Sequence, residues 1–123
     1  MPKYSIVFLA ISIISLISCG KDDEAAKVDC TGLTPTYNSD IAAIFNASCA
    51  TVGCHMGPFP ADGLDLSKYA TAKSASLNGK VLQSIKHESG AKAMPQDQGA
   101  GLIKLPAADI KKVECWIQNG APE

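Results

Sequence analysis

The sequence predicts an all-α fold, with one small helical domain behind an N-terminal export segment. Apolar residues recur at the spacing of an amphipathic helix in several short runs, most clearly between residues 110 and 117. No run of useful length alternates as a strand would, and glycine and proline clusters separate the helical runs. The 123 residues suffice for one small domain. A domain of about 80 residues buries only about 60 to 65% of its unfolded surface, so we expect a marginal core.

The N-terminus has the features of an export signal. Lys3 precedes an apolar run at residues 6–14, which is shorter than the about 20 residues of a transmembrane helix and typical of a signal peptide. Leu16-Ile17-Ser18-Cys19 follows and resembles a bacterial lipobox, which implies cleavage after residue 18 and lipidation of Cys19. The alternative is an ordinary signal peptide with an incidental cysteine. Cys19 stands where the apolar run ends, which favours the lipobox.

The chain therefore divides into a lipoprotein signal peptide (1–18), a lipidated cysteine with a flexible linker (19–37) and a folded domain (38–123). Residues 21–24, Lys-Asp-Asp-Glu, resemble a signal that sends some bacterial lipoproteins to the cell surface, although a plain soluble linker explains them equally well. We expect an exported lipoprotein, either periplasmic or anchored at the outer membrane or cell surface.

The charged residues exclude several classes of function. There are 11 lysines and arginines, all of them lysine, against 12 acidic residues, and the formal charge is −1. No basic stripe is visible, so we expect no nucleic-acid partner. No catalytic triad, phosphate-binding glycine loop or carboxylate pair stands out, and we expect Asp62 and Asp65 to serve as turn and cap residues.

The first half of the domain predicts two helices. Residues 38–40, Asn-Ser-Asp, can cap a helix over residues 41–48. Residues 57–60, Gly-Pro-Phe-Pro, cannot be helical. A turn at residues 63–69 then leads into a short helix near residues 67–76.

The second half predicts another short helix, a loop and a terminal helix. The short helix covers residues 79–87 and the loop residues 96–101. Pro106 suits the start of the last helix and Gly120 its end. One face of this helix is expected to pack against the helix over residues 41–48. Its apolar residues are Ile110, Val113 and Ile117, with Trp116 on their flank.

The most informative stretch is Cys49-Ala50-Thr51-Val52-Gly53-Cys54-His55. It resembles the haem attachment site of the cytochrome c family, whose usual form is C-x-x-C-H. The resemblance implies thioethers from Cys49 and Cys54 to one haem c, with His55 as an axial ligand of its iron. This chain differs in having four residues between the cysteines, a C-x4-C-H variant. The longer loop must bulge, and Gly53 relaxes the backbone beside Cys54.

Two further stretches strengthen the resemblance. Met94-Pro95 resembles the pair that supplies the sixth iron ligand in this family, with His87 as the second candidate. Trp116-Ile117, followed by Gly120-Ala121, resembles the terminal helix of short mono-haem c-type domains of bacterial lipoproteins. The resemblance covers residues 40–121 and implies a small cytochrome c-like helical domain wrapped around one haem. A carbonyl in the proline-rich loop, with Pro58 as the candidate, is expected to accept the other imidazole N–H of His55.

The resemblance implies an electron carrier and not an enzyme, because His/Met ligation fills both axial positions of the iron. Its partners would be redox proteins of an exported electron-transfer chain and, through the lipid anchor, the membrane. Haem attachment would leave only Cys30 and Cys115 for a disulfide, although two separately buried thiols are an alternative.

Three other functions compete with electron transfer. One is a disulfide-stapled binding lipoprotein without haem, with Cys49 bridged to Cys54 as well. Another is a zinc site built on Cys49, Cys54 and His55, for which the spacing is unfavourable. A haem peroxidase would require Met94 to leave the iron.

Overall fold

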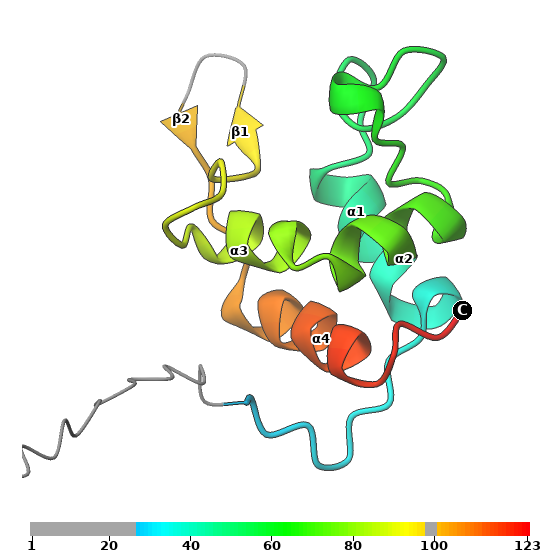
Figure 1. Ribbon diagram of the computed structural model, residues 1–123, viewed down its shortest axis with the longest axis vertical. Helices are drawn as coiled ribbons and strands as arrows, with labels where there is room; N and C mark the ends of the chain where they lie inside the picture. Colours follow the sequence, from blue (N-terminus) through cyan, green and yellow to red (C-terminus); the bar gives the residue numbers. More distant parts are fainter. Residues whose placement is uncertain (1–26, 98–100) are drawn as a thin grey trace, which may run out of the picture.

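The computed structural model describes residues 27–97 and 101–123, and Figure 1 shows their arrangement. These residues are mostly helical, which confirms the prediction of an all-α class. The expected signal peptide, the lipidated Cys19 and the start of the linker lie outside the described residues. The α-helices are α1 (Ala42–Ser48), α2 (Tyr69–Leu77), α3 (Lys80–Lys86) and α4 (Ala107–Gln118). None of the helices in the described ranges is long and apolar enough to cross a membrane.

The first helix begins earlier than the sequence predicts. A π-helical turn, η1 (Tyr37–Ile41), runs directly into α1. Thr36 caps this turn, since its hydroxyl accepts the backbone N–H of Ser39 at 3.3 Å. The expectation that residues 38–40 precede the helix as its cap is therefore wrong. Thr36 is the last residue with extended backbone, at φ −119° and ψ 163°, so its side chain takes the capping position.

The other helices lie close to their predicted positions, and three small elements were not predicted. A 3₁₀ turn, η2 (Ala61–Gly63), follows the proline-rich loop. Strands β1 (Gln96–Asp97) and β2 (Gly101–Leu102) pair antiparallel where a loop was expected. Two residues per strand are too few to produce an alternating pattern in the sequence.

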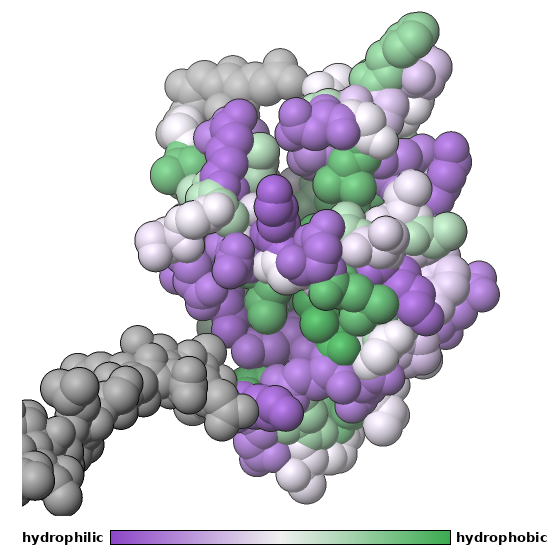
Figure 2. All heavy atoms as spheres, in the orientation of Figure 1, coloured by the Kyte–Doolittle hydropathy of each residue, from purple (hydrophilic) through white to green (hydrophobic). Residues whose placement is uncertain are grey.

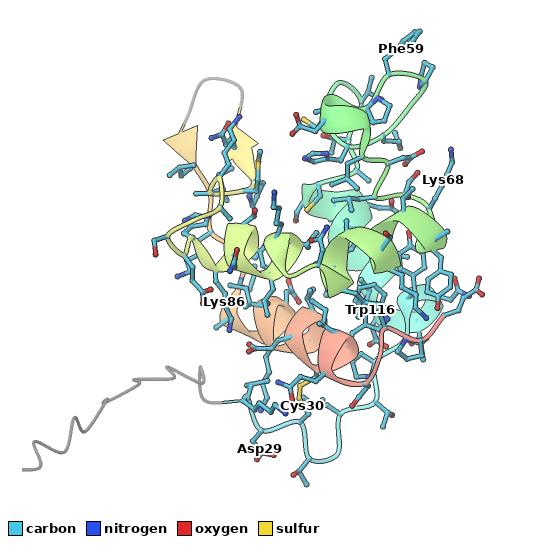
Figure 3. The ribbon with its side chains drawn as sticks, viewed as in Figure 1. Asp29, Cys30, Phe59, Lys68, Lys86 and Trp116 are labelled. Carbon is cyan, nitrogen blue, oxygen red and sulfur yellow. A yellow bond between two sulfur atoms is a disulfide. The ribbon has the colours of Figure 1, made fainter. Side chains whose placement is uncertain are left out.

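The core forms where α4 packs against η1 and α1. Trp116 and Phe45 are both fully buried, and their rings meet edge to face with centroids 6.2 Å apart. The indole N–H of Trp116 donates to the carbonyl of Pro122 at 2.7 Å, which satisfies its one polar group. The apolar faces predicted on the first and last helices thus meet. Figure 3 shows Trp116 at this contact.

A disulfide joins Cys30 to Cys115, with an S–S distance of 2.11 Å. This is the pair that the sequence analysis expects. It attaches the segment that precedes η1 to the middle of α4. In Figure 3, Cys30 lies on the side of α4 that faces away from α3. The first described residues are therefore held at the end of the molecule opposite the two limbs that rise above α2 and α3 in Figure 1.

The segment that leads into α2 contains a buried carboxylate. Asp65 accepts the hydroxyl of Ser67 at 2.5 Å and its backbone N–H at 3.0 Å, and lies 3.0 Å from the Lys68 ammonium. The hydroxyl of Ser67, followed by Lys68, holds the pKa of Asp65 below its ordinary value of 3.8. The ionised carboxylate therefore stabilises the folded state.

This carboxylate makes stability depend on pH. Because its folded-state pKa is lowered, its contribution is complete above the unfolded-state pKa and is lost as pH falls through the folded-state pKa. We expect Asp65→Asn to be less stable than wild type at neutral pH. The difference should shrink as pH falls below 3.8. Urea denaturation at each pH measures it, and a constant difference would contradict this assignment.

Candidate functional site

One cavity of about 730 Å³ contains every haem-binding residue that the sequence predicts. It lies between the limb formed by residues 48–66 and the limb formed by residues 90–96, with α2 and α3 as its floor. Figure 2 shows the surface hollowed between these limbs. The polar and sulfur-containing side chains that line the cavity are Ser48, Cys49, Cys54, His55, Asp62, Asn78, Lys80, Ser84, Lys92, Met94 and Gln96.

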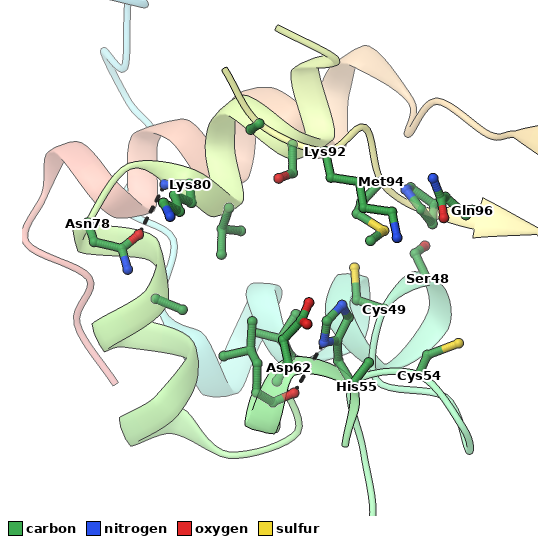
Figure 4. A pocket seen from close by; sticks show the side chains of 18 of the residues that line it. Ser48, Cys49, Cys54, His55, Asp62, Asn78, Lys80, Lys92, Met94 and Gln96 are labelled. Atoms are coloured by element: carbon green, nitrogen blue, oxygen red, sulfur yellow. Dashed lines mark hydrogen bonds between the residues drawn. The ribbon is translucent and has the colours of Figure 1, made fainter. Parts of the chain in front are cut away.

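Two different segments bring the predicted ligands together. Cys49 follows α1 directly, and Cys54 and His55 lie in the loop after it. Met94 belongs to the segment that follows α3. In Figure 4, Met94 enters the cavity from one wall, while Cys49 and His55 enter it from the other. Cys54 lies at the rim, and its sulfur is directed outward in this view. The sequence-predicted lipidation site, Cys19, is outside the described residues.

The long loop between the cysteines keeps Cys49 and His55 together. The backbone N–H of His55 donates to the carbonyl of Cys49 at 3.1 Å, and that of Cys54 donates to Thr51 at 2.9 Å. Gly53 has φ +85°, the left-handed conformation that other residues adopt only with strain. The four intervening residues therefore form a closed turn. As a result, the backbone of His55 lies beside that of Cys49 despite the unusual spacing.

The imidazole of His55 is oriented by the carbonyl of Leu64 and not by that of Pro58, so the prediction of Pro58 is wrong. Nδ1 of His55 lies 3.2 Å from this oxygen, as the dashed line in Figure 4 shows. A carbonyl oxygen can only accept, so Nδ1 carries the proton, and Nε2 of the neutral ring keeps its lone pair. The N–H of Leu66 also donates to the carbonyl of His55 at 2.9 Å. Residues 64–66 thus fix both the backbone and the ring of His55.

The two cysteines of the site are thiols in different environments. Cys49 is buried, with 7% of its surface exposed, whereas Cys54 is half-buried. Burial, with a smaller effect of Cys54, raises the pKa of the Cys49 thiol to about 11. At neutral pH the Cys49 sulfur is therefore protonated and lies against the apolar core.

Met94 is half-buried, and hydrogen bonds hold its backbone against the end of α3. Its N–H donates to the carbonyl of Ser84 at 3.0 Å. Its carbonyl oxygen lies 3.1 Å from Nε2 of His87. Both partners belong to the last turn of α3 and its C-cap.

His87, the second candidate for the sixth ligand, is not among the residues that line the cavity. It is half-buried and caps α3, with its ring turned to the Met94 backbone. Glu88 and Ser89 are exposed, but His87 makes a specific contact with the predicted ligand segment.

In residues 27–97 and 101–123, no three His, Cys, Asp or Glu side chains lie close enough together to hold a metal ion. The zinc alternative requires such a group, and the structure does not assemble one from Cys49, Cys54 and His55. A haem iron needs only one protein ligand on each face, so this criterion does not apply to it.

Sequence reasoning missed several groups of the site. The acceptor for His55 is a backbone carbonyl, which has no residue-type signature. The apolar wall includes Leu64, Leu66 and Val81, which no motif in the sequence singled out. Asn78 and Lys80 form a polar end of the cavity that no motif indicated. Comparison of the chain with known protein families, curated proteins and solved structures found no match.

Proposed function

We propose that this protein is an electron carrier with one covalently attached haem c. The observation that carries the proposal is that four residues line one cavity: Cys49, Cys54, His55 and Met94. They come from segments up to 45 residues apart in the sequence, and their residue types are those of a c-type haem site. The cytochrome c resemblance drawn from the sequence is part of this proposal.

The cavity suits a flat, largely apolar cofactor. Its volume of about 730 Å³ falls within the roughly 300 to 1,000 Å³ that is usual for ligand pockets. Leu66 and Val81 on its walls are buried apolar residues with 4% and 8% of their surface exposed. A porphyrin in this position would extend the small hydrophobic core toward the surface, which compensates for the small size of the domain.

The polar residues of the cavity match the two ends of the cofactor. Haem carries its vinyl groups on one side and two carboxylates on the other. Cys49 and Cys54 would bind the vinyl side through thioethers. Asn78 and Lys80 lie at the opposite end of the cavity from Cys54 in Figure 4. There an exposed ammonium and an amide can face the carboxylates near solvent.

The protein's own residues would hold the iron in a closed coordination shell. His55 offers Nε2 from one wall because Leu64 holds its Nδ1 proton. Met94 offers its thioether from the other wall. When bound, haem supplies reversible one-electron chemistry at iron, and a thioether ligand raises its reduction potential relative to a second histidine. With both axial positions filled, we infer a carrier and not an enzyme.

The proposed location is that of an exported lipoprotein, anchored through Cys19 in the periplasm or at the outer membrane or cell surface. The Cys30–Cys115 disulfide supports an oxidising compartment. The proposed partners are redox proteins of an exported electron-transfer chain. Since the disulfide holds the start of the domain at the end opposite the cavity, the anchor would leave the cavity accessible to such partners.

The test is a visible absorption spectrum of the oxidised and reduced protein, expressed with a c-type haem maturation system, before and after acid–acetone extraction. We expect haem bands that survive extraction, because thioethers are covalent. A colourless protein with Cys49 bridged to Cys54, despite competent maturation, would refute the proposal. That result would support the alternative, a disulfide-stapled binding lipoprotein.

Replacement of Met94 tests the axial pair. In Met94→Ala we expect loss of the sulfur-to-iron charge-transfer band. We also expect a reduction potential lower by on the order of 100 mV, a fraction of the roughly 0.8 V range that axial ligands control. Spectroscopy and potentiometry measure both effects. Met56→Ala is the matched control, because Met56 adjoins His55 and does not line the cavity. An unchanged band in Met94→Ala would exclude Met94 as the ligand.

A further inference from the structure

We propose that His87 is a positioning residue, which holds Met94 at the iron by donating a hydrogen bond from its ring to the Met94 backbone. This inference rests on the proposed haem site and assigns a task to the second histidine of the chain. The relevant contact is 3.1 Å between Nε2 of His87 and the carbonyl oxygen of Met94. Since a carbonyl can only accept, Nε2–H is the donor.

The contact completes a two-sided attachment of one residue. The N–H of Met94 donates to the carbonyl of Ser84 at 3.0 Å, and its carbonyl accepts from His87. Both polar groups of the Met94 backbone are therefore bound to the C-terminal end of α3. Residues 88–90, at the start of the intervening loop, are exposed. The preceding loop is exposed and gives the Met94 backbone little support. These two hydrogen bonds therefore hold the Met94 backbone in place.

The end of α3, which makes this contact, is held in place by core packing and by an ion pair with α4. Ile85 is 2% exposed within the core, and Lys86 lies 2.8 Å from Glu114 of α4 with both side chains largely buried. His87 itself has φ +60° and ψ +38°, and its N–H bonds to the last carbonyls of α3. This left-handed C-cap turns the chain and aims the ring toward Met94.

The same geometry argues against His87 as an iron ligand in the folded protein. Its Nε2 is engaged by the Met94 carbonyl, and the residue does not line the cavity. For His87 to reach the iron, the contact that holds Met94 would have to break. The two roles therefore exclude each other, which makes them distinguishable by experiment.

The expected consequence is weaker retention of the methionine when the ring is removed. A neutral hydrogen bond of this kind contributes a net effect that corresponds to roughly two- to tenfold in an equilibrium constant. An external ligand such as imidazole competes with Met94 for the iron. Loss of the His87 contact should therefore raise the apparent affinity of the haem protein for imidazole by that factor.

The experiment measures imidazole affinity of the haem-loaded full-length protein by absorbance in wild type, His87→Gly, Met94→Ala and the double variant. Glycine accepts the positive φ of residue 87, so the substitution removes the ring without adding backbone strain. We expect His87→Gly to bind imidazole about two- to tenfold more tightly than wild type. In the Met94→Ala background the same substitution should have no effect, because there is no methionine to displace.

A matched control separates positioning from general destabilisation. Val113→Ala alters a fully buried residue of α4 that does not line the cavity. It should lower the urea midpoint and leave imidazole affinity unchanged. If His87→Gly changes imidazole affinity equally in the wild-type and Met94→Ala backgrounds, the inference is overturned. It is also overturned if the substitution changes the affinity in neither background.

The remaining outcomes separate this inference from the proposed function. Wild-type protein with covalent haem but two histidine ligands, whose sixth ligand is lost in His87→Gly, would overturn the positioning role and Met94 as the ligand, but not the covalent haem. Wild-type protein without covalent haem would overturn the proposed function and this inference with it. Haem-loaded protein with a methionine ligand and the expected dependence on Met94 would support both.

Discussion

The double variant Cys49→Ser/Cys54→Ser is expected to carry no covalent haem. Serine keeps the size of each side chain close to that of cysteine but cannot form a thioether. The structure places Cys49 in the core beside His55 and Cys54 at the cavity rim. Each single variant retains one sulfur and should keep one thioether, so its haem remains attached.

Acid–acetone extraction and mass spectrometry of the intact protein measure this result. We expect essentially complete haem loss from the double variant on extraction, against full retention in wild type. Cys30→Ala/Cys115→Ala is the matched control, because it also removes two cysteines but neither of them lines the cavity. Covalent haem in the Cys49→Ser/Cys54→Ser variant would show that attachment occurs elsewhere, and the proposed site would be wrong.

The parts of the fold that could be predicted are those with a strong local pattern. The terminal helix repeats apolar residues at positions 110, 113 and 117, and α4 forms there because one stripe can be buried. The Cys49-to-His55 stretch likewise contains its chemistry within seven residues, so its members had to be neighbours. Met94 is different: only the fold brings it to the same cavity, and the sequence could suggest this only by resemblance.

The parts that could not be predicted depend on backbone groups or on tertiary contacts. Leu64 acts through its carbonyl, and any residue at that position offers the same atom. Which carbonyl, that of Leu64 or that of Pro58, lies beside the His55 ring depends on how the 3₁₀ turn between these two residues directs the backbone. The contact between His87 and Met94 depends on a left-handed C-cap. In the sequence alone, a histidine among polar residues looks like the exposed end of a helix. Only the left-handed backbone at His87 shows that its ring is directed to Met94.

Among the proposed variants, removal of the Cys30–Cys115 disulfide is expected to lower the free energy of unfolding the most. The bond closes a loop of 85 residues, which includes nearly the whole domain. In the chain-entropy account, a crosslink over such a loop stabilises the folded state by roughly 4 to 5 kcal/mol. The total free energy of unfolding of a small domain is only about 5 to 15 kcal/mol. Apart from the disulfide, a hydrogen bond from the side-chain amide of Asn119, the C-cap of α4, to the Leu33 carbonyl at 3.4 Å attaches the first segment to this helix.

Urea denaturation of the haem-loaded wild type and of Cys30→Ala/Cys115→Ala, both with oxidised iron, measures this loss. The double variant should have a free energy of unfolding that is lower by most of that amount. The spectrum of the folded protein should not change, since α4 separates the disulfide from the cavity in Figure 3. Equal unfolding midpoints for wild type and the double variant would contradict the prediction. A lower midpoint with an unchanged charge-transfer band would mean that the disulfide secures the domain while the cavity residues alone set the iron ligands.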